Sequence, residues 1–268
     1  MRLLFLGDVM GSAGRTAVFD RLPRLRKELA LDFVVVNGEN AAHGFGITPR
    51  IVQAFYTAGV DVLTTGNHVW DRREIMNYIG DDPRLLRPLN YRSDSPGAGK
   101  GRYETDDGRR VTVVHAMGQL FMGEVEDPFE AIRKAMADEV LGGTADFILC
   151  DIHAEATSEK MAMGHFLDGR ASAVVGSHSH VPTADAQILP GGTAYQSDAG
   201  MCGDYNSVIG MTVAPALGRF TGEDGGRLEP AAGEATLCGV LIESDDKTGL
   251  ARAIEPLRVG GRLKATGV

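Results

Sequence analysis

The sequence is poor in cysteine and tryptophan, and it contains no long hydrophobic run. Its 268 residues include one tryptophan and three cysteines, none of them in a Cys-x-x-Cys spacing. Such scattered cysteines argue against a disulfide framework and against a structural zinc site, and Cys150 and Cys238 lie in apolar runs typical of buried strands. The apolar stretch before Asp8 is far too short for a signal peptide or a membrane span. We therefore expect a cytoplasmic protein that does not interact with a membrane.

The chain also lacks an excess of basic residues. It has 27 lysines and arginines against 36 acidic residues, for a formal net charge of −9. This balance argues against a protein that coats long nucleic acids or anionic membranes through an extended basic surface. A small anionic substrate stays compatible with it, because a bound metal ion can reverse the field locally.

Short apolar runs alternate with segments of helical periodicity along most of the chain. The runs "RLLFLGD", "DFVVVNGEN" and "DVLTTGNH" are typical of parallel strands that helices cover on both faces. Thr48-Pro49 predicts a helix start, Asp107-Gly108 predicts a hairpin turn, and Thr157 is expected to open a helix with a partial capping box. No repeat or linker interrupts the pattern. The sequence therefore predicts a single α/β domain over residues 1–268.

Polar residues able to bind metals stand at the ends of five predicted strands. In α/β sheets, ligands collect beyond the carboxyl ends of the strands, so these side chains are expected to share one rim. Each residue alone is more often a turn, cap or core residue, but turn chemistry would favour Gly, Pro and Ser as readily. The candidates are Asp8, Glu39, Asn40, Asn67, His68, His153, His178 and His180.

The pair His178 and His180 is separated by a single serine, so on a strand both side chains would point to the same face. Mixed oxygen and imidazole ligands suit iron, manganese or zinc. Without His68, the candidates include seven possible ligands, which exceed what one ion with an open position would use. A pair of ions bridged by a carboxylate such as Glu39 is therefore expected.

The order of these motifs, "GD … GEN … GNH … H … GSHSH", resembles that of the calcineurin-like metallophosphoesterases. The chain departs from the usual pattern at two places. Met10 stands where the family has histidine, and Glu39-Asn40 stands where the family has a bridging aspartate. Both departures are shared by the YmdB-like branch of 2′,3′-cyclic nucleotide phosphodiesterases, which "NGENAAHG", "GNHVWD" and "HAEATSEK" also resemble. The resemblance covers nearly the whole chain. It implies an α/β/β/α sandwich of two mixed β-sheets flanked by helices.

The resemblance also implies a division of the ligands between two transition metal ions, with iron or manganese preferred over zinc. Glu39 would be shared, Asn40 would replace the missing histidine, and His68 would be the general acid. A hydroxide bridging the ions would attack the phosphorus of a 2′,3′-cyclic nucleotide. One ion would be held by Asp8, Glu39, Asn40 and His180, and the other by Glu39, Asn67, His153 and His178.

Several further interpretations accompany this hypothesis. His43, in the glycine-rich "AAHGFGIT", is a candidate for substrate binding, and Glu155 and Asp198 are candidates to orient metal ligands. A phosphomonoesterase or nucleotidase of the same fold is an alternative, and so is a non-catalytic regulator that binds metal. The expected partner is a small nucleotide or phosphodiester, and a homo-oligomer is expected because most soluble oligomers are of this kind.

Overall fold

Two six-stranded mixed β-sheets form the centre of the structure, a computed structural model that describes residues 1–267. In spatial order, the first sheet contains β14 (Ala251–Val259), β13 (Leu237–Ser244), β1 (Arg2–Leu6), β3 (Phe33–Asn37), β4 (Val62–Thr64) and β5 (Leu85–Leu86). The second contains β10 (Gln187–Ile188), β11 (Ala194–Gln196), β9 (Ala173–Ser177), β8 (Phe147–His153), β7 (Arg110–Met117) and β6 (Lys100–Glu104). A small third sheet pairs β12 (Met201–Cys202) with β2 (Asp8–Val9).

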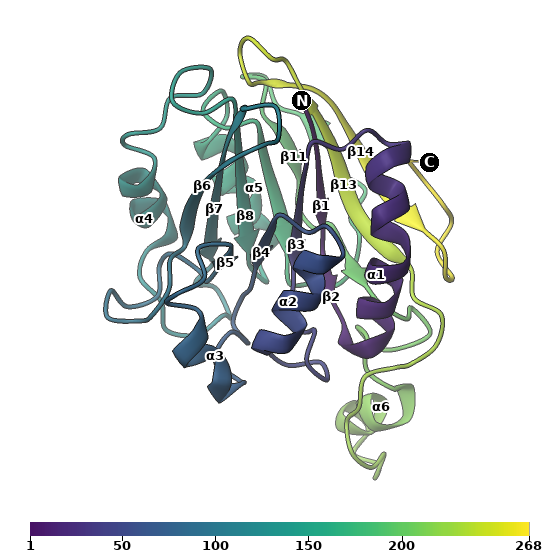
Figure 1. Cartoon of the computed structure of the whole chain (residues 1–268). Coiled ribbons are helices and arrows are strands. Elements are labelled where there is room, and N and C mark those ends of the chain that lie inside the picture. The colour runs from purple at the N-terminus through teal and green to yellow at the C-terminus, as the bar shows by residue number, and fades with distance from the viewer. Residues whose placement is uncertain (268) are drawn as a thin grey trace.

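Helices lie on the outer faces of both sheets (Figure 1). Beside the first sheet are α1 (Gly11–Glu28), α2 (Pro49–Thr57) and α3 (Arg73–Tyr78), and their apolar side chains join its outer core. Beside the second sheet are α4 (Pro128–Ala135) and α5 (Thr157–Phe166). The remaining helix, α6 (Val213–Thr221), projects below the sheets in Figure 1.

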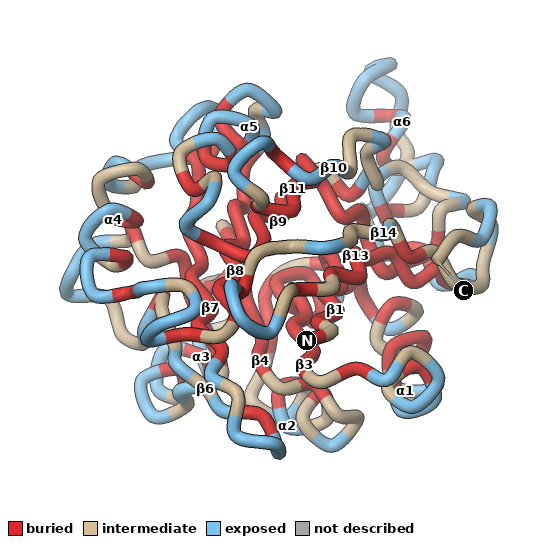
Figure 2. The backbone as a smooth tube through the Cα atoms, turned by 90° about the horizontal axis from the view of Figure 1, so that it is seen from above, coloured by how far each residue is buried: buried red, intermediate tan, exposed pale blue. Residues whose placement is uncertain are grey.

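The alternation of side chains along β1 divides the core into layers. Leu3 and Phe5 point into the core between the two sheets, where they pack with Phe147. Leu4 and Leu6 point to the other side and pack under the helices. The buried segments run through the centre of the molecule in Figure 2. The predicted α/β/β/α sandwich is therefore confirmed. Each sheet is covered by helices on one face and by the other sheet on its second face, which explains why its strands are apolar.

The parallel strands and the hairpin at Asp107-Gly108 are confirmed, because β6 and β7 pair antiparallel across that turn. Helix α2 begins at Pro49 after Thr48, as predicted, although the Thr48 side chain forms no capping hydrogen bond. The capping box at Thr157 is wrong: Ala156 is the N-cap, and Thr157 is already helical. The apolar run 213–221 forms a helix that the sequence pattern did not suggest.

Among the helices of residues 1–267, none combines the length and the apolar character needed to cross a membrane.

Candidate metal centre

The carboxyl ends of the central parallel strands converge on one rim of the sandwich. Strand β1 runs into Asp8, β3 into the loop with Glu39, and β4 into the loop with Asn67. From the second sheet, β8 ends at His153 and β9 is followed directly by His178. The two sheets thus bring together residues that lie more than 100 positions apart in the chain.

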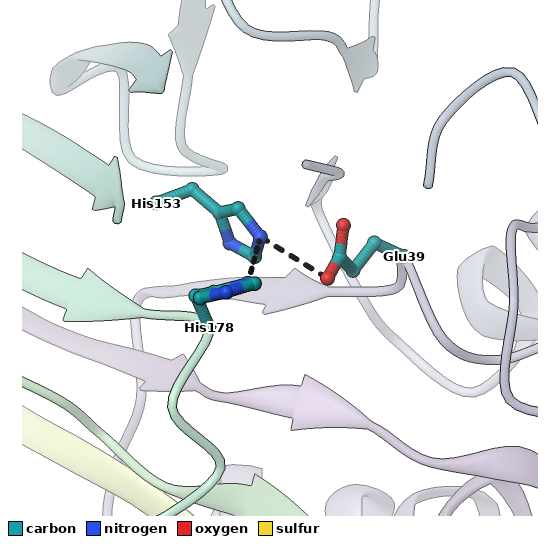
Figure 3. Close-up of side chains that lie close together, drawn as sticks. All are labelled: Glu39, His153 and His178. Carbon is teal, nitrogen blue, oxygen red and sulfur yellow. Dashed lines mark hydrogen bonds and ion pairs between the residues drawn. The ribbon is translucent and has the colours of Figure 1, made fainter. Parts of the chain in front are cut away.

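Glu39, His153 and His178 form one cluster, which Figure 3 shows. The Nε2 atom of His153 lies 3.1 Å from Oε1 of Glu39 and 3.1 Å from Nδ1 of His178. The same Nε2 atom lies 3.0 Å from the carboxamide oxygen of Asn67. The four side chains assigned to one ion from the sequence therefore meet at one point.

Asp8, Glu39 and His180 form a second cluster, in which the donor atoms lie within 4.8 Å of one another. The carboxamide oxygen of Asn40 lies 3.2 Å from Nε2 of His180, while its amide nitrogen donates to the backbone oxygen of Gly44. The Nδ1 atom of His180 is held 2.7 Å from the backbone oxygen of Ile209. Glu39 belongs to both clusters, which is the position that a bridging carboxylate requires.

The donor set and its surroundings fit bound metal ions. Oδ1 of Asp8 is buried and has no hydrogen-bond partner, which is costly unless a cation lies against it. Gly66 leaves the space that the cluster needs, because a Cβ atom there would lie 2.2 Å from Oε2 of Glu39 and 2.4 Å from Nε2 of His153. Carboxylate, carboxamide and imidazole ligands without thiolates suit divalent transition metals.

The pKa values of these residues reflect a site built to hold positive charge. Burial raises the pKa of Asp8 to about 6, against the effect of the neighbouring imidazoles. Burial disfavours charge on Glu39 too, but His153 outweighs it and lowers the pKa of Glu39 to about 2. Burial likewise opposes charge on His153, yet Glu39 and Asp8 raise its pKa to about 9. Burial and the charge of His153 lower the pKa of His178 to about 3. Without metal, His153 thus carries the proton that a metal ion would replace.

A buried polar network behind the first cluster fixes the orientation of His153. Its Nδ1 atom lies 2.9 Å from Oγ of Ser177, and that hydroxyl donates to Oδ1 of Asp151 at 2.7 Å. Since the Ser177 hydrogen points to Asp151, Ser177 accepts from Nδ1–H of His153, which leaves Nε2 free to bind metal in the neutral ring. Asp151 also accepts from Thr64 at 2.6 Å and lies 3.2 Å from Nδ1 of His115.

Ser177 and Asp151 are functional candidates that the sequence reasoning missed. Both are fully buried and both lie inside strands. A charged residue in the middle of the apolar run "FILCDIH" was the available signal, because an aspartate is rarely buried unless it is paired.

The loop after β9 has strained backbone. His178 has φ +99° and His180 has φ +64°, values that non-glycine residues rarely adopt. Asp198 holds this loop by accepting from the backbone N–H of Ser179 at 2.9 Å. Lys160 lies 2.8 Å from the same carboxylate, and both side chains are almost completely buried. The prediction that Asp198 orients a ligand therefore agrees with its contacts, although it acts through the backbone.

His68 opens onto a pocket of 240 Å³ that also contains Glu39, His178 and His180. Its Nδ1 atom lies 2.8 Å from Oδ2 of Asp71, and Phe45 packs edge-on against its ring at 5.0 Å. Asp71 thereby accepts from Nδ1, so Nε2 is the atom left to exchange a proton with a substrate.

The remaining candidates lie at or beyond the edge of this pocket. Oε2 of Glu155 lies 3.3 Å from Nε2 of His178, where it can orient the ring. Met10 is buried and lines the pocket with apolar surface. His43 is exposed and lines two neighbouring hollows, whereas the pocket of the metal cluster is lined by other residues of its loop.

Comparison with known proteins agrees with this architecture. The fold is that of the metallophosphoesterase class. The chain belongs to the YmdB-like family, because the model of that family, described as "YmdB-like protein", matches residues 4–257. It is 44% identical over 262 residues to the 2′,3′-cyclic-nucleotide 2′-phosphodiesterase of Bacillus subtilis, covering 97% of each chain.

Two solved structures share the fold over almost their whole length. A crystal structure of a hypothetical protein from Thermus thermophilus has a TM-score of 0.89 and 43% identity, covering 97% of this chain and 99% of that one. A novel phosphatase from Mycoplasma pneumoniae has a TM-score of 0.89 and 31% identity, covering 97% and 93%.

Proposed function

We propose that this protein is a phosphodiesterase with two metal ions that hydrolyses nucleoside 2′,3′-cyclic phosphates. The observation that carries the proposal is the pair of donor clusters that share Glu39 and open onto the same pocket as His68. The activity printed in the name of the Bacillus subtilis relative supports the choice of substrate. Iron or manganese is the proposed metal, with zinc as a third possibility on ligand chemistry.

The proposed ligands divide as the clusters do. Glu39 serves both ions, and each ion takes three further residues. One ion is assigned to Asp8, Asn40 and His180 in addition to Glu39, and the other to Asn67, His153 and His178. Bound there, two such ions would supply Lewis acidity that lowers the pKa of a coordinated water and neutralises charge on the phosphoryl oxygens.

His68 donates a proton to the leaving group, and its neighbours Asp71 and Phe45 contact its ring. The oxygen of water forms a bond to phosphorus and loses one proton to solvent. The bond between phosphorus and the 2′ oxygen breaks, that oxygen takes a proton from Nε2 of His68, and solvent returns a proton to the ring. The product is a nucleoside 3′-phosphate. Asp71 holds Nδ1 and so leaves Nε2 for proton transfer, while Phe45 packs edge-on against the ring. General acid assistance of this kind contributes about 10²- to 10⁴-fold to the rate.

The test uses purified, metal-loaded protein and two substrates, 2′,3′-cyclic AMP and an aryl monophosphate. The proposal expects turnover of the cyclic diester and much slower turnover of the monoester. Preference for the monoester would favour a phosphomonoesterase, an alternative to which the name of the Mycoplasma pneumoniae structure gives weight. Protein that binds metal but is inert on both substrates would favour a regulatory binding protein.

The proposal also takes residues 1–268 as one domain of a cytoplasmic homo-oligomer, and residue 268 lies outside the described residues. Light scattering coupled to size exclusion measures the oligomeric state directly.

A further inference from the structure

Four arginines surround two hollows beside the metal pocket. A hollow of 540 Å³ is lined by Arg15, Arg50 and Arg72, and a hollow of 510 Å³ by Arg72 and Arg227. The two hollows share Arg72 and His43. They therefore form one continuous cationic region rather than two separate sites.

The charge of these arginines is not neutralised by ion pairs. Within residues 1–267, none of the four guanidinium groups lies within 4.0 Å of a carboxylate oxygen, whereas ten other arginines do. Glu74 and Glu229 are the carboxylates that line the hollows. In a chain whose net charge is −9, an excess of cations confined to one place favours an anionic ligand there.

Two of the arginines hold the loop of residues 41–45, which lies between the hollows and the metal pocket. Arg15 donates to the backbone oxygen of Ala41, and Arg72 donates to those of Ala42 and Phe45. A guanidinium has five N–H donors, so most of theirs are left for a ligand. Arg50 is exposed and its side chain makes no hydrogen bond to residues 1–267, so its charge is fully available.

The cationic region lies next to the metal pocket on two sides. Phe45 lines the metal pocket, while its loop neighbour His43 lines both hollows. On the other side, Met211 lines the metal pocket and pairs by a β-bridge with Pro230, which lines the 510 Å³ hollow. The metal pocket and the hollows are therefore neighbours, separated by the loop that contains His43 and Phe45.

We propose that the cationic region binds the phosphate backbone of nucleotides that precede a 2′,3′-cyclic phosphate, so that short single-stranded RNA 3′ ends are substrates. The inference rests on the proposed function, because it places the terminal cyclic phosphate at the metals. A cyclic mononucleotide has one phosphate and leaves the arginines without a partner. An oligoribonucleotide brings one further phosphate per residue, and arginine binds phosphate through two parallel hydrogen bonds.

The first test compares 2′,3′-cyclic AMP with a triribonucleotide that ends in a 2′,3′-cyclic phosphate. The trinucleotide is expected to have at least about a tenfold higher kcat/KM, the gain of one charge-assisted hydrogen bond. Its advantage should fall with salt, because two phosphate contacts on a single strand predict about a sevenfold loss between 50 and 200 mM. Equal kcat/KM values for the two substrates would overturn the inference and leave the proposed function intact.

The second test uses Arg50→Gln and Arg227→Gln, chosen because neither side chain holds the loop by a hydrogen bond within the described residues. Each is expected to lower the ratio of the two kcat/KM values by about three- to tenfold. Lys247→Gln is the matched control, since it removes one positive charge from the turn between β13 and β14. The register of Glu243 with Arg2 places this turn at the start of β1, whereas Asp8 follows the other end of that strand. The same drop in the control would mean a general charge effect and would overturn the inference.

A binding measurement separates this inference from the proposed function. Fluorescence anisotropy of a fluorescein-labelled trinucleotide with a 3′-phosphate reports binding to wild-type protein without any turnover. Weaker binding to Arg50→Gln than to Lys247→Gln would support the phosphate-binding role of the cationic region, and this result does not depend on hydrolysis. Equal binding to the two variants would overturn the inference, whether or not the protein hydrolyses the cyclic diester. Displacement of the trinucleotide by an equal concentration of an aspartate-rich peptide would show a site for acidic proteins and would overturn it.

Discussion

Replacement of Ser177 by alanine tests the network that orients His153. The change removes the acceptor 2.9 Å from Nδ1 of His153 and the donor 2.7 Å from Asp151. Oδ1 of Asp8 lies 3.8 Å from Nδ1, too far for a hydrogen bond, and Asp8 is itself a proposed ligand. The imidazole then loses the contact that keeps its hydrogen on Nδ1, and Nε2 is no longer reserved for metal. Loss of such an outer contact costs about 10- to 100-fold in metal affinity, or about 1.4–2.8 kcal/mol.

Titration of metal-free protein with manganese, followed by calorimetry, measures this effect without reference to activity. Ser172→Ala is the matched control, because Ser172 is equally buried, directly precedes the same strand and accepts from the backbone N–H of Ile148 at 3.0 Å. Both variants should lose about 1–3 kcal/mol of stability, but only Ser177→Ala should lose metal affinity. Equal manganese affinities for wild type and Ser177→Ala would refute the reasoning.

Three further predictions follow from the same contacts. His68→Ala should retain both metal ions by elemental analysis and lose about 10²- to 10⁴-fold in turnover, whereas loss of metal would make His68 a ligand. Because the pKa of His153 is raised to about 9 in the metal-free protein, a metal ion competes with a proton for this ring below pH 9. Manganese binding at pH 7 should therefore release about one proton, and the affinity for manganese should rise up to tenfold per pH unit from pH 7 to 9. Calorimetry in buffers of different ionisation enthalpy measures both effects. A pH-independent affinity would contradict the assigned charge of His153. Lys160→Met should lower the free energy of unfolding by about 3–5 kcal/mol, because it leaves the buried carboxylate of Asp198 without its cation; urea denaturation with an unchanged midpoint would exclude this role.

The chemical composition of the site could be predicted from the sequence. Each proposed ligand follows a short apolar run, and parallel strands place such positions on one edge of a sheet whatever the details of packing. For Asp8, Glu39 and His153, order along the chain and residue type were therefore sufficient to predict that the three side chains lie on one rim. Helix limits depend on packing as well: α1 begins at Gly11 and continues through Pro23, because packing against the first sheet outweighs local propensity.

Only the tertiary structure decided what surrounds those ligands. Ser177 and Asp151 meet because β8 and β9 are neighbours in register, with His153 opposite Ser177. The arginines of the cationic region come from α1, α2 and two loops, so no local pattern links them. The proposed ligands are defined by residue type and by position at strand ends, which are local properties of the sequence. Hydrogen-bond partners and charge clusters depend on distances between segments far apart in the chain, and packing of the two sheets and their helices sets those distances.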